Sequence, residues 1–400
     1  MTHHPRHDSR HGGWSRRYQL TAIIGTLVLC LALAACGSSS STNSSSASSS
    51  AAPAASGSSA AGSASGAPGA AAAALKQWTA APTKINITQP LKAAPPTGKT
   101  IVMLGTNNPS NVLIQQEMKK LASMAKWNYS LVSYDPANPG TFNSALTSAL
   151  AKHPQYLVEA GLPLTASQLA QAKNAGAKWI LDSVYPATVK SPVLADVDAY
   201  AQDALMGKII ADYFVSDSKG KGNAVIEHVP SYPILNGFTD GFQKEVKAQC
   251  PGCKASITNL TIPDLVAGKV PSTMVSALRS NPSANYVVSD DGPFFDGLTS
   301  ALAGAGLAGK VKVIGEAADQ AGIAGLKNGT EQAWTGFDPT YQAYLNMDTA
   351  FRDAEGIPVP VAQEGLQPTQ LLTKQTIGSA TNWSQPTDAQ QQFLKLWQLQ

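Results

Sequence analysis

The sequence predicts an α/β protein of two doubly wound, parallel-sheet lobes joined by a three-segment hinge. Three observations lead to this prediction. Short apolar segments rich in β-branched residues alternate with amphipathic helical segments from residue 100 onward. A stretch rich in proline and small residues, 184–197, interrupts the alternation and is read as a connection between lobes. The alternation then resumes in the same order, so one architecture is expected twice.

The first lobe begins with a strand at 100–104 and a helix in which Ile114, Met118 and Leu121 share one face. The later segments expected as strands are 129–134, 156–160, 178–183, 223–228, 255–260, 286–289, 311–315 and 332–335. The later segments expected as helices are 142–151, 167–175, 200–214, 232–247, 272–280, 294–305, 321–327 and 340–354. A late crossover is expected to return the last strand and helix to the first lobe. The expected lobes are therefore 99–190 with 318–356, and 191–317 with 357–400.

The first 98 residues are expected to lie outside the folded lobes. Residues 1–35 have the order of a bacterial export signal: arginines, then an apolar stretch, then small residues. Leu33 to Cys36 resembles the lipobox of bacterial lipoproteins, which implies cleavage before Cys36 and lipidation of that cysteine. An ordinary cleaved signal is the alternative, and export by the Sec or the twin-arginine route is left open. Residues 36–98 are expected to form a disordered tether, because serine, alanine and glycine dominate its first part.

Charge and cysteine content narrow the function classes. The formal net charge is +3, and part of it belongs to the export signal, so no nucleic-acid partner is expected. Cys250 and Cys253 flank Pro251 and Gly252, a pair suited to a tight turn. In an oxidising compartment they are expected to form a structural disulfide. A thioredoxin-like redox pair is the alternative, although that motif normally opens a helix after a strand.

Five stretches, in order along the chain, resemble the type I periplasmic binding proteins of the ribose/galactose group. They are 106–110 (TNNPS), 172–177 (AKNAGA), 236–242 (NGFTDGF), 287–291 (VVSDD) and 309–315 (GKVKVIG). The resemblance implies two Rossmann-like lobes that close over a small, sugar-like solute and then meet an ABC permease. It implies no cofactor and no metal. With the lipobox, it places the protein outside the cell on the outer face of the cytoplasmic membrane.

The expected ligand contacts lie in loops that follow strands, where open parallel sheets bind ligands. They are Asn107, Asn108, Ser110, Asp182, Tyr185, Ser231, Tyr232, Asp290, Asp291, Glu316, Phe337 and Asp338. Several have structural alternatives. The two asparagines, like Asp291 and Asp338, are also suited to cap the helices that follow them, and Tyr232 and Phe337 are also suited to packing.

The chain departs from the sugar receptors at three positions. Residues 231–235 lack their usual arginine, Ala317 stands where they have an aspartate, and Phe337 stands where they have a glutamine. The identity of the ligand therefore stays open.

The sequence also bears on two other function classes. An enzyme is not expected, because the motifs of hydrolases and nucleotide-binding loops are missing. The GxGxxG spacing at 304–309 follows a helix instead of a strand. A ligand sensor or a partner-binding module of the same fold remains the alternative to transport.

Overall fold

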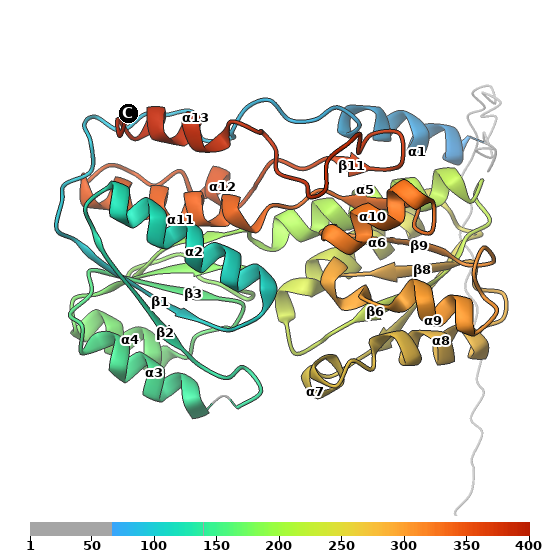
Figure 1. Ribbon diagram of the computed structural model, residues 1–400, viewed down its shortest axis with the longest axis horizontal. Helices are drawn as coiled ribbons and strands as arrows, with labels where there is room; N and C mark the ends of the chain where they lie inside the picture. The colour runs from blue at the N-terminus through green and yellow to red at the C-terminus, as the bar shows by residue number, and fades with distance from the viewer. Residues whose placement is uncertain (1–65, 139) are drawn as a thin grey trace, which may run out of the picture. The chain divides into compact units, whose positions relative to one another are not determined.

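The structure is a computed structural model that describes residues 66–138 and 140–400. The predicted export signal, Cys36 and the first part of the tether lie outside these residues. From residue 67 onward the chain forms two lobes, each built on one sheet (Figure 1). The predicted fold class of two α/β lobes with parallel sheets is confirmed.

The first lobe contains a fully parallel sheet of order β2-β1-β3-β4-β5. Side chains alternate across it: Ile101 and Met103 face one hydrophobic cluster, and Val102 and Leu104 face another. Such two-sided burial is typical of parallel sheets covered by helices on both faces. The strands are β1 (Thr100–Gly105), β2 (Asn128–Ser133), β3 (Tyr156–Ala160), β4 (Lys178–Asp182) and β5 (Val193–Val197).

Helices cover both faces of this sheet. Figure 1 shows α2 and α11 on one side and α3 and α4 on the other. Trp397, just after α13, is fully buried against Phe351 of α11, with 5.1 Å between the ring centroids. The helices are α2 (Pro109–Met124), α3 (Gly140–Leu150), α4 (Ala166–Asn174), α11 (Pro339–Ala354), α12 (Val361–Glu364) and α13 (Ala389–Leu396).

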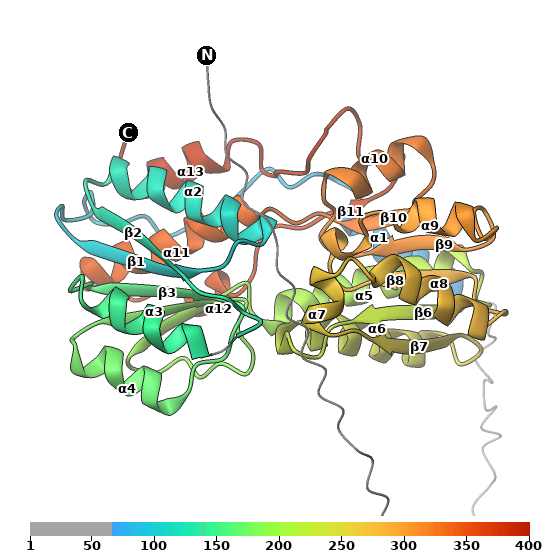
Figure 2. The same cartoon turned by 60° about the horizontal axis from the view of Figure 1, so that its bottom comes forward.

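The second lobe contains a sheet of order β11-β10-β9-β8-β6-β7, which Figure 2 shows from top to bottom. All pairings are parallel except that of β11 with β10. The short β11 therefore closes one edge of the sheet. The strands are β6 (Asn223–His228), β7 (Lys254–Asn259), β8 (Tyr286–Ser289), β9 (Lys312–Gly315), β10 (Ala333–Thr335) and β11 (Leu371–Leu372).

The helices of the second lobe also form two layers. Those packed on one face are α1 (Ala67–Leu75), α5 (Tyr200–Asp217) and α6 (Asn236–Gln249), and those on the other are α8 (Val270–Ser280), α9 (Leu298–Gly304) and α10 (Gln320–Asn328). The short elements are α7 (Ile262–Val266) and the 3₁₀ turns η1 (Lys76–Trp78), η2 (Pro233–Leu235) and η3 (Gly292–Phe295).

Glycine permits the close packing of α5 on α6. A Cβ atom on Gly207 would lie 2.1 Å from the carbonyl oxygen of Phe238, and one on Gly241 would lie 2.2 Å from that of Ala204. Each helix therefore presents a glycine to the backbone of the other.

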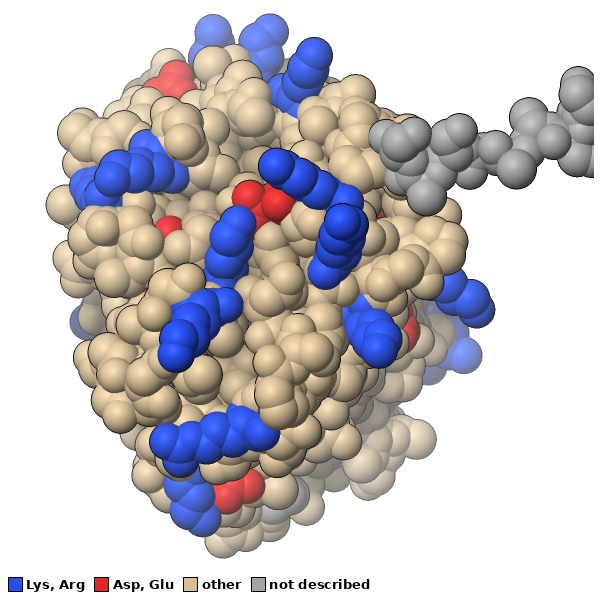
Figure 3. Space-filling view, turned by 90° about the vertical axis from the view of Figure 1, so that its right-hand side faces the viewer, with Lys and Arg blue, Asp and Glu red and all other residues tan. Residues whose placement is uncertain are grey.

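The outer surface of the second lobe is rich in basic side chains. Figure 3 shows lysine and arginine spread over the end of the molecule that lies on the right in Figure 1, with few acidic groups among them. Many acidic side chains of this lobe are instead buried, among them Asp203, Asp212, Glu227, Asp290 and Glu316.

Three expected lobe boundaries are wrong. Residues 184–197 are not only a connection: β5 pairs with β4 and completes the first sheet, so the boundary falls near Asp198. Strand β10 pairs with β9, and α10 packs on the second lobe through Ile323 and Leu326, so within 318–356 only α11 returns to the first lobe. Residues 389–400 pack on the first lobe through α13 instead of on the second.

The expected tether is folded in its last part. Helix α1 packs on α5, with Ala71 and Leu75 buried, and Ile85, Ile87 and Leu91 are buried in the first lobe. These apolar side chains provide contacts that the serine-rich part lacks. The described chain passes between the lobes five times, not three, because both terminal segments cross as well.

Candidate functional site

The cavity that both lobes line has a volume of about 1050 Å³. Its walls come from loops at the carboxyl ends of β1, β2, β3 and β4 in the first lobe and of β6, β8, β9 and β10 in the second. These loops meet because all eight strands run parallel within their own sheets. The arrangement can enclose a small molecule between two polar loop sets.

The loop after β1 contributes Asn107 and Ser110 to the lining. Asn108 also lines the cavity, but it is the N-cap of α2, and its side-chain oxygen accepts the Asn111 N–H at 2.7 Å. The capping interpretation is therefore confirmed for Asn108. Asn107 is exposed and has no such role, so it is free to donate to and accept from a ligand.

Asp182 lines the cavity from the end of β4. It also belongs to a network of side-chain hydrogen bonds among the segments that connect the two lobes. Its carboxylate accepts the Nε2 of Gln342 at 2.8 Å and the Nδ2 of Asn346 at 2.6 Å. Gln342 also donates to Asp198 at 3.0 Å, and Gln367 donates to Asp198 at 2.8 Å. Burial, followed by the charge of Asp198, raises the pKa of Asp182 well above its ordinary value. Asp182 and Asp198 together therefore link three chain crossings through Gln342 and Gln367.

Asp290 lines the cavity at the end of β8 and is held from behind. Its Oδ2 lies 2.7 Å from Nδ1 of His228. Burial lowers the pKa of His228, so a neutral imidazole that donates its Nδ1–H fits this contact. Burial raises the pKa of Asp290 well above its ordinary value, and its Oδ1 has no hydrogen-bond partner among the described residues.

Asp291 and Glu316 line the cavity beside Asp290. Asp291 precedes η3, but its side chain makes no capping hydrogen bond, so the capping interpretation is wrong for this residue. Burial, followed by the charge of Glu227, raises its pKa to about 8. Glu316 is 2% exposed, and burial followed by the charge of Asp203 raises its pKa well above the ordinary value.

Aromatic side chains complete the second-lobe wall. Tyr232, Phe294 and Phe337 line the cavity. The sequence did not single out Asp203, Asp198 or Gln342 as site residues. All three lie in the lining, and two of them belong to helices instead of strand-end loops.

Three expected contacts lie outside the lining. Tyr185 stacks on Tyr200, with 4.4 Å between the ring centroids. Ser231 is exposed and does not line the cavity. Asp338 is the N-cap of α11, and its carboxylate accepts the Thr340 N–H at 2.9 Å. For Asp338 the capping interpretation is confirmed.

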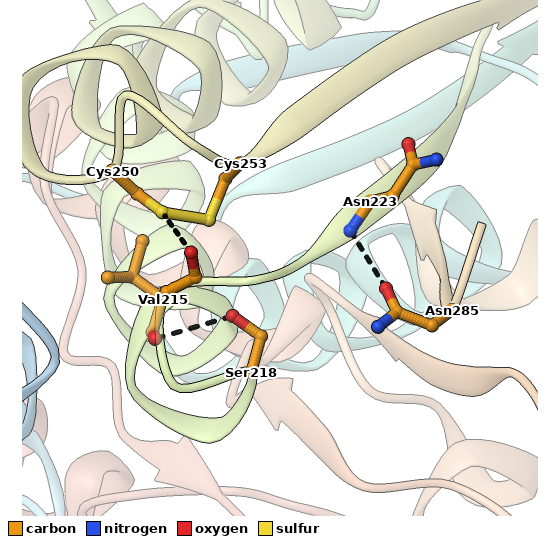
Figure 4. The surroundings of a disulfide bond; sticks show 7 residues. Val215, Ser218, Asn223, Cys250, Cys253 and Asn285 are labelled. Carbon is orange, nitrogen blue, oxygen red and sulfur yellow. Dashed lines mark hydrogen bonds between the residues drawn. A yellow bond between two sulfur atoms is a disulfide. The ribbon is translucent and has the colours of Figure 1, made fainter. Parts of the chain in front are cut away.

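The cysteine pair lies away from the cavity, at the end of α6. Figure 4 shows Cys250 and Cys253 joined by a disulfide. The Cys250 sulfur lies 3.3 Å from the carbonyl oxygen of Gly220. The pair joins the end of α6 to the start of β7, and neither sulfur reaches the cavity lining. This position, after a helix and before a strand, agrees with the expected structural disulfide and differs from that of a redox motif, which opens a helix.

Two absences apply to residues 66–138 and 140–400. In this part of the chain, no group of three or more histidine, cysteine or acidic side chains is arranged to hold a metal ion. No helix there has the length and apolar character needed to cross a membrane.

Two α/β lobes with a cavity at their strand ends form a two-lobed protein with a ligand-sized site between the lobes. A family model described as a periplasmic binding protein domain matches residues 100–357, more than half of the chain. The chain therefore belongs to this family, in agreement with the resemblance to type I periplasmic binding proteins and with the prediction that it is not an enzyme. A comparison with curated proteins found no match.

Solved structures share the fold. A solute-binding protein of an ABC transporter from Mycobacterium smegmatis, with bound glycerol, is 20% identical, with a TM-score of 0.62 over 72% of this chain and 98% of that chain. The 5-methylthioribose transporter solute-binding protein from Thermotoga lettingae, in complex with 5-methylthioribose, is 16% identical, with a TM-score of 0.62 over 78% and 100%. A solute-binding protein from Burkholderia graminis, in complex with D-arabinose, is 19% identical, with a TM-score of 0.61 over 73% and 100%. At these identities the likeness establishes the fold.

Proposed function

We propose that the protein is the solute receptor of an ABC importer and captures a small hydroxylated solute in the cavity between its lobes. The observation that carries the proposal is that strand-end loops of both lobes line one cavity of about 1050 Å³. A solute there contacts both lobes at once, so it binds a closed arrangement better than an open one. This difference in affinity drives closure. The sugars and polyols named for the similar structures support a hydroxylated ligand.

The loop after β1 supplies the groups suited to hydroxyls. Asn107 offers an amide that donates and accepts, and Ser110 offers a hydroxyl with both capacities. Tyr232, Phe294 and Phe337 offer apolar faces against which a sugar ring or a carbon chain packs. These residues are proposed as ligand contacts, together with Asp290, Asp291 and Glu316.

The proposed address is the outer face of a bacterial cytoplasmic membrane, with lipidated Cys36 as the anchor and an ABC permease as the partner. The lipobox-like sequence before Cys36 and the serine-rich segment after it support this address. In that oxidising compartment the bond between Cys250 and Cys253 is expected to persist. Replacement of Cys36 by serine is expected to move the protein from the membrane fraction to the soluble extracellular fraction.

A thermal-shift screen of sugars, polyols, nucleosides and amines tests the binding role. A solute at about 100 times its dissociation constant adds about 2.7 kcal/mol to the free energy of unfolding, so the midpoint rises measurably. Small-angle scattering of the same mixture should then give a smaller radius of gyration. If no small solute raises the midpoint, the solute-receptor proposal falls and the partner-binding alternative gains support.

A further inference from the structure

The cavity is lined by acidic side chains without basic counterparts. Eight aspartates and glutamates line it, and the described lining contains no lysine, arginine or histidine. On the second lobe three of them come from different elements: Asp203 from α5, Asp291 from the end of β8 and Glu316 from the end of β9. Buried carboxylates of like charge repel one another, so their ionised forms are unfavourable unless hydrogen-bond donors or cations pair with them.

Glu316 lacks a partner although it is almost fully buried. Its side chain is 2% exposed and lines the cavity, and its Oε2 has no hydrogen-bond partner among the described residues. Asp290 differs in that its Oδ2 is already held by His228 at 2.7 Å, although its Oδ1 also has no partner among the described residues. A buried acceptor without a donor costs about 1–3 kcal/mol, and more when it is charged. A ligand group that donates hydrogen bonds and carries positive charge would therefore compensate Glu316.

A metal ion does not fit this need. Within the described ranges no three carboxyl groups converge closely enough to coordinate one. A cation that binds here would pair with Glu316 and be attracted by the carboxyls of Asp203 and Asp291 in the same lining. An ammonium group donates up to three hydrogen bonds and accepts none, whereas a hydroxyl donates only one and brings no charge. The rings of Phe294 and Phe337 in the same lining also favour a cation over a neutral group.

We propose that the solute carries a protonated amine beside its hydroxyl groups, as an amino sugar or amino polyol does, and that the amine binds at Asp203, Asp291 and Glu316. The hydroxyl groups then meet Asn107 and Ser110 across the cavity. This inference rests on the proposed function, since it names the class of solute that the receptor takes.

The test compares solutes that differ only by amine against hydroxyl. Binding of D-glucosamine and D-glucose, of D-galactosamine and D-galactose, and of serinol and glycerol is measured by titration calorimetry at pH 7. At least one amine should bind about ten- to hundredfold more tightly than its neutral partner, because one charged hydrogen bond contributes about 1.5–3 kcal/mol. Neutral solutes that bind as well as amines overturn this inference and leave the receptor role intact. If neither these pairs nor any solute of the broader screen binds, both proposals fall.

A charge-removing variant locates the amine. Glu316→Gln keeps the size of the side chain, so it should abolish the preference for the amine while weak binding of the neutral partner persists. Glu117→Gln, on α2 outside the cavity lining, is the matched control and should leave the preference unchanged. If Glu316→Gln binds the amine as tightly as the parent protein does, the proposed amine site is refuted.

Proton release gives a second readout that needs no variant. The charged groups around Glu316 are Asp203, Asp290, Asp291 and Asp198, all acidic, and burial with their charges raises its pKa. A bound ammonium favours the ionised carboxylates, so amine binding should release protons. Calorimetry in two buffers of different ionisation enthalpy measures this release. A net release of zero contradicts the proposal even when Glu316→Gln does not fold.

Discussion

The carboxyl of Asp196 makes the stability of the first lobe depend on pH. Asp196 lies in β5 and is 6% exposed, and its Oδ1 accepts the Val184 N–H at 3.2 Å. Burial outweighs this hydrogen bond, and together with the charge of Asp198 it raises the pKa from 3.8 to about 8. The native state therefore holds this proton more tightly than the unfolded chain. The contribution of this proton to the free energy of unfolding is therefore fully present at low pH and is lost as the pH rises toward 8.

The magnitude follows from the two pKa values. One pKa unit corresponds to about 1.4 kcal/mol. Because the unfolded chain ionises Asp196 more readily, the raised pKa lowers the free energy of unfolding by about 5 kcal/mol at pH 7.5 and by about 2 kcal/mol at pH 5, relative to a residue that does not ionise. Asp196→Asn keeps a side-chain oxygen for Val184 and removes the ionisation. The variant should gain about 3 kcal/mol more in free energy of unfolding at pH 7.5 than at pH 5.

Urea denaturation followed by tryptophan fluorescence at the two pH values measures this difference. Asp388→Asn, at an exposed position before α13, controls for the loss of an aspartate. The same gain at both pH values would refute the reasoning, since it would mean that Asp196 has the same pKa in the native and unfolded states.

Two further predictions concern packing and cross-linking. Gly207→Ala should lower the free energy of unfolding by about 1–3 kcal/mol, because the new Cβ would collide with the backbone of α6. Gly304→Ala, where nothing lies within 4 Å of an added Cβ, should not lower it, and equal losses in both variants would contradict the packing argument. Reduction of the bond between Cys250 and Cys253 should raise the mass of the peptide that contains both by two hydrogens and cost about 2 kcal/mol of stability. A mass unchanged by reduction would show that the two thiols are free.

The sequence patterns predicted the repeating strand–helix units because both periodicities are local. Segments such as 156–160 and 223–228 coincide with β3 and β6, since a short β-branched run between two helical patterns leaves little choice. Strand β5 was missed because Asp196 interrupts its apolar pattern and a proline-rich stretch precedes it. Its burial depends on pairing with β4, which no local pattern reports.

Lobe membership could not be predicted from periodicity alone. Strand β10 has the same character whichever sheet it joins. Its place beside β9 follows from the short connection through α10, a crossover between neighbouring parallel strands. The terminal segments posed a similar problem, since α1 and α13 have no strand partner and are positioned by side-chain packing alone.

The sequence predicted cavity-lining residues only where these residues directly follow strands. Asn107, Asp290 and Glu316 were expected at strand ends, and all three line the cavity. Asp203 and Gln342 were missed because they lie inside helices, where strand-end rules do not apply. Helical periodicity could have indicated Asp203. It lies four residues before Gly207 and seven before Ile210, so it falls on the buried face of α5. An acidic residue on an otherwise buried stripe has lost its solvent and needs a polar partner.

The five crossings bear on how such a molecule closes. Both terminal segments are fixed to α11: Arg352, fully buried, donates to the carbonyl of Gln89 at 2.6 Å, and the indole of Trp397 donates to Asp348 at 2.7 Å. Any relative motion of the lobes must therefore change the backbone angles of the loops that cross between them, because the helices and strands on either side of these loops are held by buried contacts. Asp182 and Asp198 bind Gln342 where three crossings meet, directly beside the cavity. Under the proposed function, a solute that rearranged these hydrogen bonds would act on the connections themselves and so couple occupancy of the cavity to lobe closure.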